Sequence, residues 1–174
     1  MNLPFLVTIT GPESTGKSTL ATQLSAQPGA WLVPDVSRAY VGALQRPYTA
    51  ADVLHIAAEI IAAEDRAWRS GANLIISDND LLNIKIWLRY YQWEVPAWLH
   101  QQIVQRHSAL YLLCATDLPW VPDPQRQNEH DRLQLYAAFE QELQALSAPY
   151  RVVQGTGAGR LQMALAAIRW RWAQ

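Results

Sequence analysis

Gly11-Pro12-Glu13-Ser14-Thr15-Gly16-Lys17-Ser18 is the most informative segment of this chain of 174 residues. It matches the pattern G-x-x-x-x-G-K-[ST], in which successive backbone N–H groups surround phosphate oxygens. The apolar segment Phe5 to Thr10 precedes it, and a helical segment with Leu20 and Leu24 on one face follows it. This order of strand, loop and helix predicts a phosphate-binding loop, because a simple glycine-rich turn would not require Lys17-Ser18 at this offset.

Each position of the loop has an expected task. Gly11 and Gly16 permit backbone angles and close approaches that a Cβ atom would obstruct. Lys17 is expected to contact the β and γ phosphates of ATP, and Ser18 is expected to bind Mg²⁺. The residues expected to contact the nucleotide are Gly11, Glu13, Ser14, Thr15, Gly16, Lys17, Ser18 and Thr19.

Five strand-like segments alternate with helical ones. They are nearly continuous in apolar or β-branched residues, as expected of strands that helices cover on both faces. The segments are Phe5 to Thr10, Ala30 to Val33, Asn73 to Ser77, Ala109 to Cys114 and Tyr150 to Gln154. This alternation predicts an α/β P-loop NTPase fold with a five-stranded, mainly parallel sheet and with residues 1–174 in one domain.

Several helix ends and loops can also be predicted. Thr49-Ala50-Ala51-Asp52 resembles a capping box, and Gly71 can end the long amphipathic helix that follows it. Near the C-terminus, four apolar residues at helical spacing predict a helix that packs on the sheet. They are Leu161, Leu165, Ile168 and Trp172. Gly155 to Gly159 is expected to be a loop, and Cys114 a small core residue.

Net charge and hydropathy argue against two classes of partner. A formal net charge of −1 and a pI near 6.4 provide no field that would attract nucleic acid or an anionic membrane. No apolar run approaches the roughly 20 residues needed to cross a bilayer, and Met1-Asn2-Leu3-Pro4 lacks the basic start of a signal peptide. We therefore expect a cytoplasmic protein whose partners are small molecules.

Three acidic residues are expected at the carboxyl edge of the sheet, where ligands bind in parallel α/β folds. Asp78 follows the third strand-like segment, and we assign it to the Mg²⁺ shell. Asp35 follows the second segment, and Asp80 lies two residues beyond Asp78, so either could accept the proton of a substrate hydroxyl. The alternative for both is structural, because each precedes a predicted helix as an N-cap, with Leu81 to Tyr91 following Asp80.

The segment from Asp117 to Asp131 follows the fourth strand and is rich in proline, polar and charged residues. A loop at this position in small-molecule kinases closes over the site and directs arginines to the transferring phosphoryl group. Arg126 and Arg132 are the candidates for that role. A solvated surface loop is the alternative, but the length and position of the segment favour a lid.

Four of the eight tryptophans fall in segments that are expected to flank an acceptor pocket. They are Trp87, Trp93, Trp98 and Trp120. An aromatic base could stack on one of them, whereas packing in the core or at the rim is the commoner use of such residues.

The chain resembles the ribosylnicotinamide kinase domain of NadR-like NAD-salvage proteins over nearly its whole length. The likeness rests on Gly11 to Ser18, on Ser37-Arg38-Ala39-Tyr40, on Asp78-Asn79-Asp80 with Trp87, and on Asp117-Leu118-Pro119-Trp120-Val121 with Asp123 and Arg126. The last group is the most discriminating, because many families share the first. The sequence departs from the family pattern at Asp35-Val36-Ser37, where a Glu-Tyr-Ala-like stretch is expected.

The resemblance implies a nucleoside/nucleotide-kinase-like three-layer fold. It also implies transfer of the ATP γ-phosphate to the 5′-hydroxyl of nicotinamide riboside, which gives nicotinamide mononucleotide in NAD biosynthesis. Asp78 and Asp80 would serve the metal and the acceptor. The expected substrate contacts are Asp35, Arg38, Tyr40, Asp80, Trp87 and Trp120. Family members often carry an adenylyltransferase domain and a DNA-binding domain ahead of the kinase, and we expect neither activity here, because the chain begins at the kinase's first strand.

Two alternatives remain at this point. The first keeps the kinase chemistry but changes the acceptor to another nucleoside or a small alcohol. The second is a regulatory switch that binds ATP and signals to a partner without phosphorylating a small molecule. A kinase would release ADP only when its acceptor is present, whereas the regulatory switch would show no release of ADP that depends on an acceptor.

Overall fold

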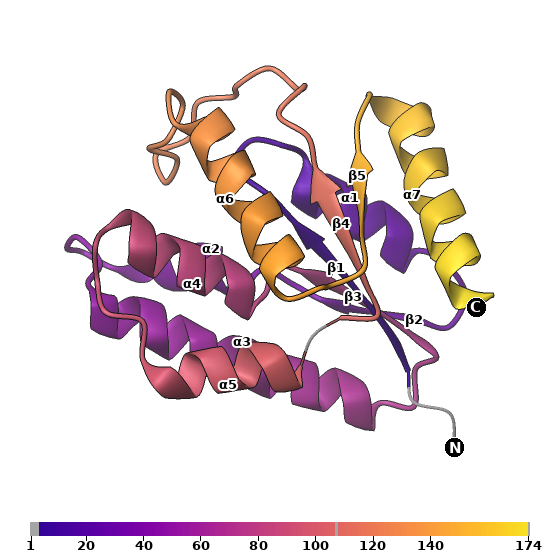
Figure 1. Cartoon of the computed structure of the whole chain (residues 1–174), viewed down its shortest axis with the longest axis horizontal. Helices are drawn as coiled ribbons and strands as arrows, with labels where there is room; N and C mark the ends of the chain where they lie inside the picture. The colour runs from indigo at the N-terminus through magenta and orange to yellow at the C-terminus, as the bar shows by residue number, and fades with distance from the viewer. Residues whose placement is uncertain (1–3, 107, 174) are drawn as a thin grey trace.

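The computed structural model describes residues 4–106 and 108–173. Its centre is a five-stranded sheet, which helices surround in Figure 1. The strands are β1 (Phe5–Thr10), β2 (Ala30–Val33), β3 (Leu74–Asp78), β4 (Leu110–Cys114) and β5 (Tyr150–Val153). Their order in the sheet is β2-β3-β1-β4-β5, and all four neighbouring pairs are parallel. The α/β fold with a parallel sheet is therefore confirmed. The start of the chain, on which the expectation of no signal peptide rests, lies outside the described residues.

Strand β1 occupies the middle of the sheet. Ile9 is in register with Asp78 at the end of β3, and Thr10 is in register with Leu113 near the end of β4. Because all strands run in the same direction, the segments after β1, β3 and β4 begin at the same edge. This register brings the predicted phosphate loop, the acidic segment from Asp78 and the predicted lid together.

Helices form a layer on each face of the sheet (Figure 1). Their bounds are α1 (Lys17–Ser25), α2 (Val36–Ala43), α3 (Ala50–Arg69), α4 (Leu81–Tyr90), α5 (Ala97–Gln105), α6 (Arg132–Ala145) and α7 (Gly157–Trp172). Buried residues of α1 and α7 pack with one set of strand residues, and those of α3 to α6 pack with another. In β4, Leu112 and Leu113 point to opposite layers, as alternation along a strand requires.

Caps at the helix ends explain where several helices begin. Thr49 and Asp52 form the predicted capping box of α3. Asp35 accepts a hydrogen bond from the Ser37 amide at 2.9 Å, and Asp80 accepts one from the Asn83 amide at 3.2 Å. Both acids are thus N-caps, as the structural alternative predicted.

The structure corrects one predicted segment. Gly155 to Gly159 was expected to be a loop, but α7 begins at Gly157. The backbone hydrogen bond from Arg160 N to Thr156 O, 3.4 Å long, closes the first turn of this helix. The five strands begin and end within one residue of the predicted segments, and α4 ends at Tyr90, one residue before the predicted end. Cys114 is buried as expected.

A buried ion pair joins α4 to α6. Lys85 donates to Glu142 at 2.6 Å, and both side chains are at least nine-tenths buried. Arg89 binds the other carboxylate oxygen of Glu142 from the surface. A buried charge without a counter-charge is costly, so Lys85 and Glu142 must remain in contact. Their contact therefore fixes how the two helices face one another.

Replacing Glu142 with Gln should destabilise the protein strongly. The substitution leaves the Lys85 ammonium buried without a counter-charge, which costs about 3–5 kcal/mol. Urea denaturation measures the loss in the free energy of unfolding. The matched control is Glu59→Gln, because the His55–Glu59 pair is about half exposed and should contribute less than about 0.5 kcal/mol. Equal losses for the two variants would contradict this assignment.

Candidate functional site

The phosphate loop adopts a conformation that requires its two glycines. Gly11 has φ 130°, and a Cβ atom there would lie 2.9 Å from the carbonyl oxygen of Cys114. Gly16 has φ 75°, and a Cβ atom there would lie 2.9 Å from the Leu118 side chain. Inside the loop, the Thr15 hydroxyl donates to the Pro12 carbonyl at 2.8 Å. The loop is therefore packed against the end of β4 and the start of the predicted lid.

Lys17 lies inside this loop. Its Nζ donates to the carbonyl oxygens of Gly11 at 2.8 Å and Pro12 at 2.7 Å. Burial lowers the pKa of Lys17, and the surrounding carboxylates of Asp78, Asp35 and Glu13 oppose that decrease. An ammonium held this close to the loop amides has the chemistry to neutralise a phosphate.

Asp78 lies beside the first turn of α1. Burial raises its pKa, and the nearby Asp35 carboxylate raises it further, while Ser18 and Lys17 oppose the increase. Its Oδ1 atom is buried and has no hydrogen-bond partner among the described residues. A carboxylate oxygen with spare capacity next to a hydroxyl fits the ligand preferences of Mg²⁺.

One cavity of about 220 Å³ extends from the phosphate loop to an apolar wall. At its polar end, it is lined by every residue from Gly11 to Thr19 and by Asp35, Arg38, Asn79 and Arg126. At its other end, the lining residues include Tyr48, Ile56, Ile84, Trp87 and Phe139, which come from α3, α4, α6 and the segment before α3. The cavity thus has a charged end and an aromatic end.

The two candidate bases occupy different places. Asp35 lines the cavity, and Asn79, with φ 99°, donates to Asp35 Oδ1 at 3.4 Å. Asp80 does not line it. Instead, Asp80 borders a separate cavity of about 10 Å³ together with Glu64, and burial raises the pKa of Asp80 to about 7. The structure therefore brings Asp35, and not Asp80, to the phosphate loop.

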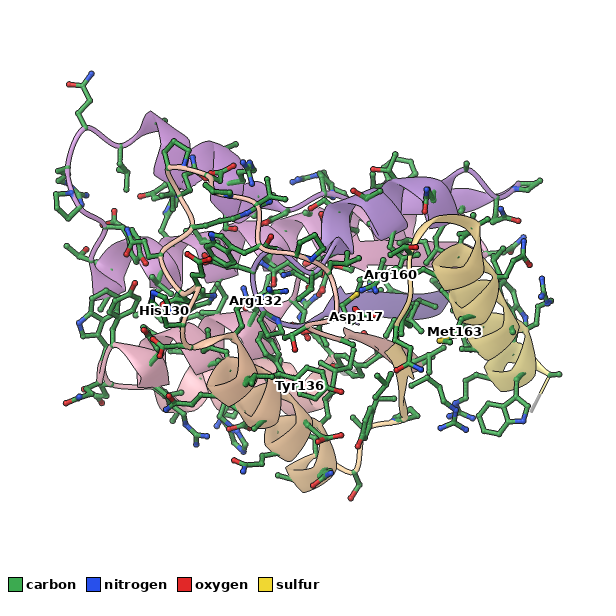
Figure 2. All side chains as sticks on the ribbon, turned by 90° about the horizontal axis from the view of Figure 1, so that it is seen from above. Asp117, His130, Arg132, Tyr136, Arg160 and Met163 are labelled. Atoms are coloured by element: carbon green, nitrogen blue, oxygen red, sulfur yellow. The ribbon has the colours of Figure 1, made fainter. Side chains whose placement is uncertain are left out.

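The segment 117–131 lies across the phosphate loop. The Val121 amide donates to the Ser14 hydroxyl at 2.9 Å, and the Gln127 amide donates to Glu13 at 3.2 Å. Arg126 lines the cavity and donates to the Val121 carbonyl at 2.6 Å. Arg132 contacts the carbonyls of Ser14 and Leu118 and is not among the cavity-lining residues, although its side chain extends from α6 toward the loop (Figure 2).

A second contact holds this segment to α2. Arg38 forms a salt bridge with Asp123, and the Gln125 side chain donates to the Arg38 carbonyl at 3.3 Å. Gly42 makes room for this contact, because a Cβ atom there would lie 2.7 Å from the Gln125 side chain. Arg38, predicted to contact substrate, therefore both borders the cavity and holds the lid segment.

The predicted aromatic contacts separate into two groups. Trp87 lines the cavity and stacks on Tyr91 at a centroid distance of 5.9 Å. Trp120 lies outside it, with the Arg132 guanidinium 5.8 Å from its ring, and Tyr40 donates its hydroxyl to Asp52 at 3.0 Å. The structure does not place Trp120 or Tyr40 on the cavity wall.

Several cavity residues were not among the site residues predicted from the sequence. Asn79 and Asn83 lie beside the predicted acids, so their position after β3 was a usable signal. Tyr48 and Phe139 gave none, because an aromatic residue that lines a cavity is indistinguishable in sequence from a core residue.

Solved structures share this fold at low sequence identity. NadR protein in complex with NR has a TM-score of 0.81 and 18% identity, with 97% of this chain and 51% of that chain covered. NadR in complex with NAD and AMP-PNP has a TM-score of 0.77 and 18% sequence identity, with 97% of this chain and 50% of that chain covered. The chain thus spans about half the length of either. The predicted resemblance to NadR is confirmed at the level of the fold.

A further solved structure and a family model also match the chain. Thymidylate kinase from Ehrlichia chaffeensis has a TM-score of 0.69 at 11% identity, with 97% of this chain and 99% of that chain covered. A sequence search of curated proteins returned no match. Within the described residues, none of the helices has the length and hydropathy that crossing a membrane requires. A family model described as an AAA domain matches residues 6–160, and the chain therefore belongs to that family.

Proposed function

We propose that this protein is an ATP-dependent kinase that transfers the γ-phosphate to the 5′-hydroxyl of nicotinamide riboside and forms nicotinamide mononucleotide. One observation carries this proposal: a single cavity joins the phosphate loop to an aromatic wall. A donor and an acceptor can therefore lie end to end, which phosphoryl transfer requires. The fold likeness to NadR in complex with NR supports the choice of acceptor.

The phosphate loop and two cationic side chains would stabilise the transferring group. The backbone N–H groups of Glu13 to Ser18 would supply fixed donors, and Lys17 would exchange its carbonyl contacts for phosphate oxygens. Arg126 borders the same cavity and reaches Ser14 Oγ at 3.4 Å, so it can contact the phosphate from the lid side. Arg132 binds the outer side of the loop, and its contribution is to hold the lid segment in place.

Ser18 and Asp78 would hold Mg²⁺. Among the described residues, no group of three or more His, Cys, Asp or Glu side chains gathers as a metal site. That finding agrees with Mg²⁺, which is usually held by one or two carboxylates together with substrate phosphates and waters. The ion, when bound, would neutralise charge on the β and γ phosphates.

Asp35 is our candidate for the group that accepts the proton of the acceptor hydroxyl. It borders the cavity between the phosphate loop and α2. Its Oδ1 atom accepts hydrogen bonds from Ser37 and Asn79, which fixes the orientation of the carboxylate. The cap and the base are compatible roles, because a carboxylate can accept several hydrogen bonds at once.

The fold likeness also supports a second acceptor class. Thymidylate kinase from Candida albicans has a TM-score of 0.71 at 17% identity, with 98% of this chain and 93% of that chain covered. Deoxyadenosine kinase from M. mycoides with bound dATP has a lower TM-score of 0.56. A kinase for another nucleoside or nucleotide would use the same phosphate loop and differ only at the aromatic end.

Product detection by mass spectrometry tests the acceptor. With ATP and Mg²⁺, nicotinamide riboside should gain one phosphate, whereas deoxyadenosine and thymidine monophosphate should remain unchanged. Lys17→Ala should lower turnover at least about 100-fold, because one preorganised group is lost from the transition state. Phosphorylation of a different acceptor would refute nicotinamide riboside as the substrate but would still support a kinase activity. ATP binding without any phosphorylated product would favour the regulatory switch.

Paired Asn substitutions test the base. Asp35→Asn should lower kcat about 10²–10⁴-fold, the usual contribution of a general base. Asp80→Asn should leave kcat within about twofold, because Asp80 lies outside the cavity and Asn is an equally good N-cap. Steady-state kinetics measures both variants, and the Asp80 variant is the matched control. A large loss of kcat for Asp80→Asn and a small one for Asp35→Asn would instead identify Asp80 as the general base.

A further inference from the structure

A buried arginine supports the phosphate loop from behind. Arg160 lies in the first turn of α7 and is 5% exposed. Its guanidinium donates to Thr15 O at 2.7 Å, to Gly155 O at 2.9 Å and to Asp117 Oδ1 at 3.1 Å. It therefore joins the phosphate loop, the turn before α7 and the first part of the lid segment.

The contact with Thr15 determines where an amide of the loop points. The described residues contain no cis peptide bond, so the N–H of Gly16 points away from the Thr15 carbonyl. Arg160 is absent from the cavity wall, whereas Thr15 and Gly16 line it. Holding the Thr15 carbonyl on the outer side thus leaves the Gly16 N–H free for the cavity.

A second guanidinium makes the equivalent contact one residue earlier. Arg132 donates to Ser14 O at 3.2 Å and also to Leu118 O at 3.0 Å. Two successive carbonyls of the loop, Ser14 and Thr15, are therefore bound from outside by arginines that also hold the start of the lid segment. Figure 2 shows Asp117 and Arg160 beside each other, with Arg132 approaching from α6.

The charge of Arg160 is only partly compensated. Asp117 is its salt-bridge partner, and this carboxylate is about one-third exposed. Burial opposes a decrease in the pKa of Asp117, but the Gly155 amide and Arg160 lower that pKa. Burial raises the pKa of the neighbouring Cys114 thiol, so the thiol stays neutral and adds no counter-charge. A buried cation bonded to the Thr15 carbonyl polarises the peptide and strengthens its N–H as a donor.

We propose that Arg160 is a positioning residue for the nucleotide phosphates: it orients and polarises the Thr15–Gly16 peptide and links that peptide to the lid through Asp117. The inference rests on the proposed function, because it concerns the same phosphate loop. It makes nucleotide affinity depend on a side chain that the cavity does not contain.

Two substitutions of Arg160 test the role. Arg160→Gln should weaken binding of ATP and ADP at least about tenfold, because the loop loses a charge-assisted hydrogen bond. The affinity of Arg160→Lys for ATP and ADP should lie between that of Arg160→Gln and that of the unsubstituted protein. Lysine keeps the charge but lacks the planar guanidinium that can bond several acceptors. Titration calorimetry with Mg²⁺ gives the dissociation constants. Binding of the acceptor, with nicotinamide riboside as the probe, should change less than about twofold.

Arg106→Gln is the matched control. Arg106 directly follows α5 and pairs with Asp65 of α3 at 2.7 Å. It does not line the cavity at the phosphate loop, so its loss should leave nucleotide affinity within about twofold. Urea denaturation confirms that each variant is folded. If Arg160→Gln does not fold, Arg160→Lys and Asp117→Asn decide the matter by the same titrations.

Two results would overturn the inference. One is parental affinity for ATP in folded Arg160 variants. The other is an equal loss of nucleotide and riboside binding, which would indicate general damage to the fold. Failure of the proposed function is distinguishable, because it would appear as absent nucleotide binding or absent phosphoryl transfer in the unsubstituted chain.

Discussion

The site depends on the conformation of the phosphate loop, Gly11 to Ser18. This conformation needs left-handed backbone at Gly16 and a close approach between Gly11 and Cys114. It also needs a rigid support, which β1 supplies as the buried central strand between β3 and β4. Because all strands are parallel, the same edge that holds the loop also receives Asp78 and the lid segment. The chemistry of the site follows from this placement.

The aromatic end of the cavity depends on helix packing rather than on the sheet. Residues from α3, α4 and α6 form its wall, and the Lys85–Glu142 pair holds α4 against α6. Aromatic contacts extend this arrangement: the hydroxyls of Tyr48 and Tyr91 are 2.7 Å apart, and Tyr91 stacks on Trp87. These contacts hold the aromatic wall together, while the lid segment crosses the phosphate loop through hydrogen bonds and is held to α2 by one salt bridge.

Local sequence patterns predicted most of the fold. The loop motif, the strand-like segments and the Thr49 capping box depend on neighbouring residues, so one sequence contains them. The separation of Asp35 from Asp80 could not be read in this way, because both follow a strand and both cap a helix. Tyr48, Phe139 and Arg160 acquire their positions from contacts with residues far away in the sequence, such as that between Arg160 and Thr15. The prediction of a loop at Gly155 to Gly159 was wrong because it used local preference alone. Glycines favour loops locally, yet packing of α7 on the sheet extends the helix to Gly157.

Binding of a nucleoside triphosphate to the unsubstituted, folded protein tests the central claim most directly. Titration calorimetry with MgATP should give a saturable signal for one site, and inorganic triphosphate should compete with it, because the loop amides and Lys17 grip phosphate rather than the base. Absence of heat with every nucleoside triphosphate tried, in protein shown to be folded, would contradict the account.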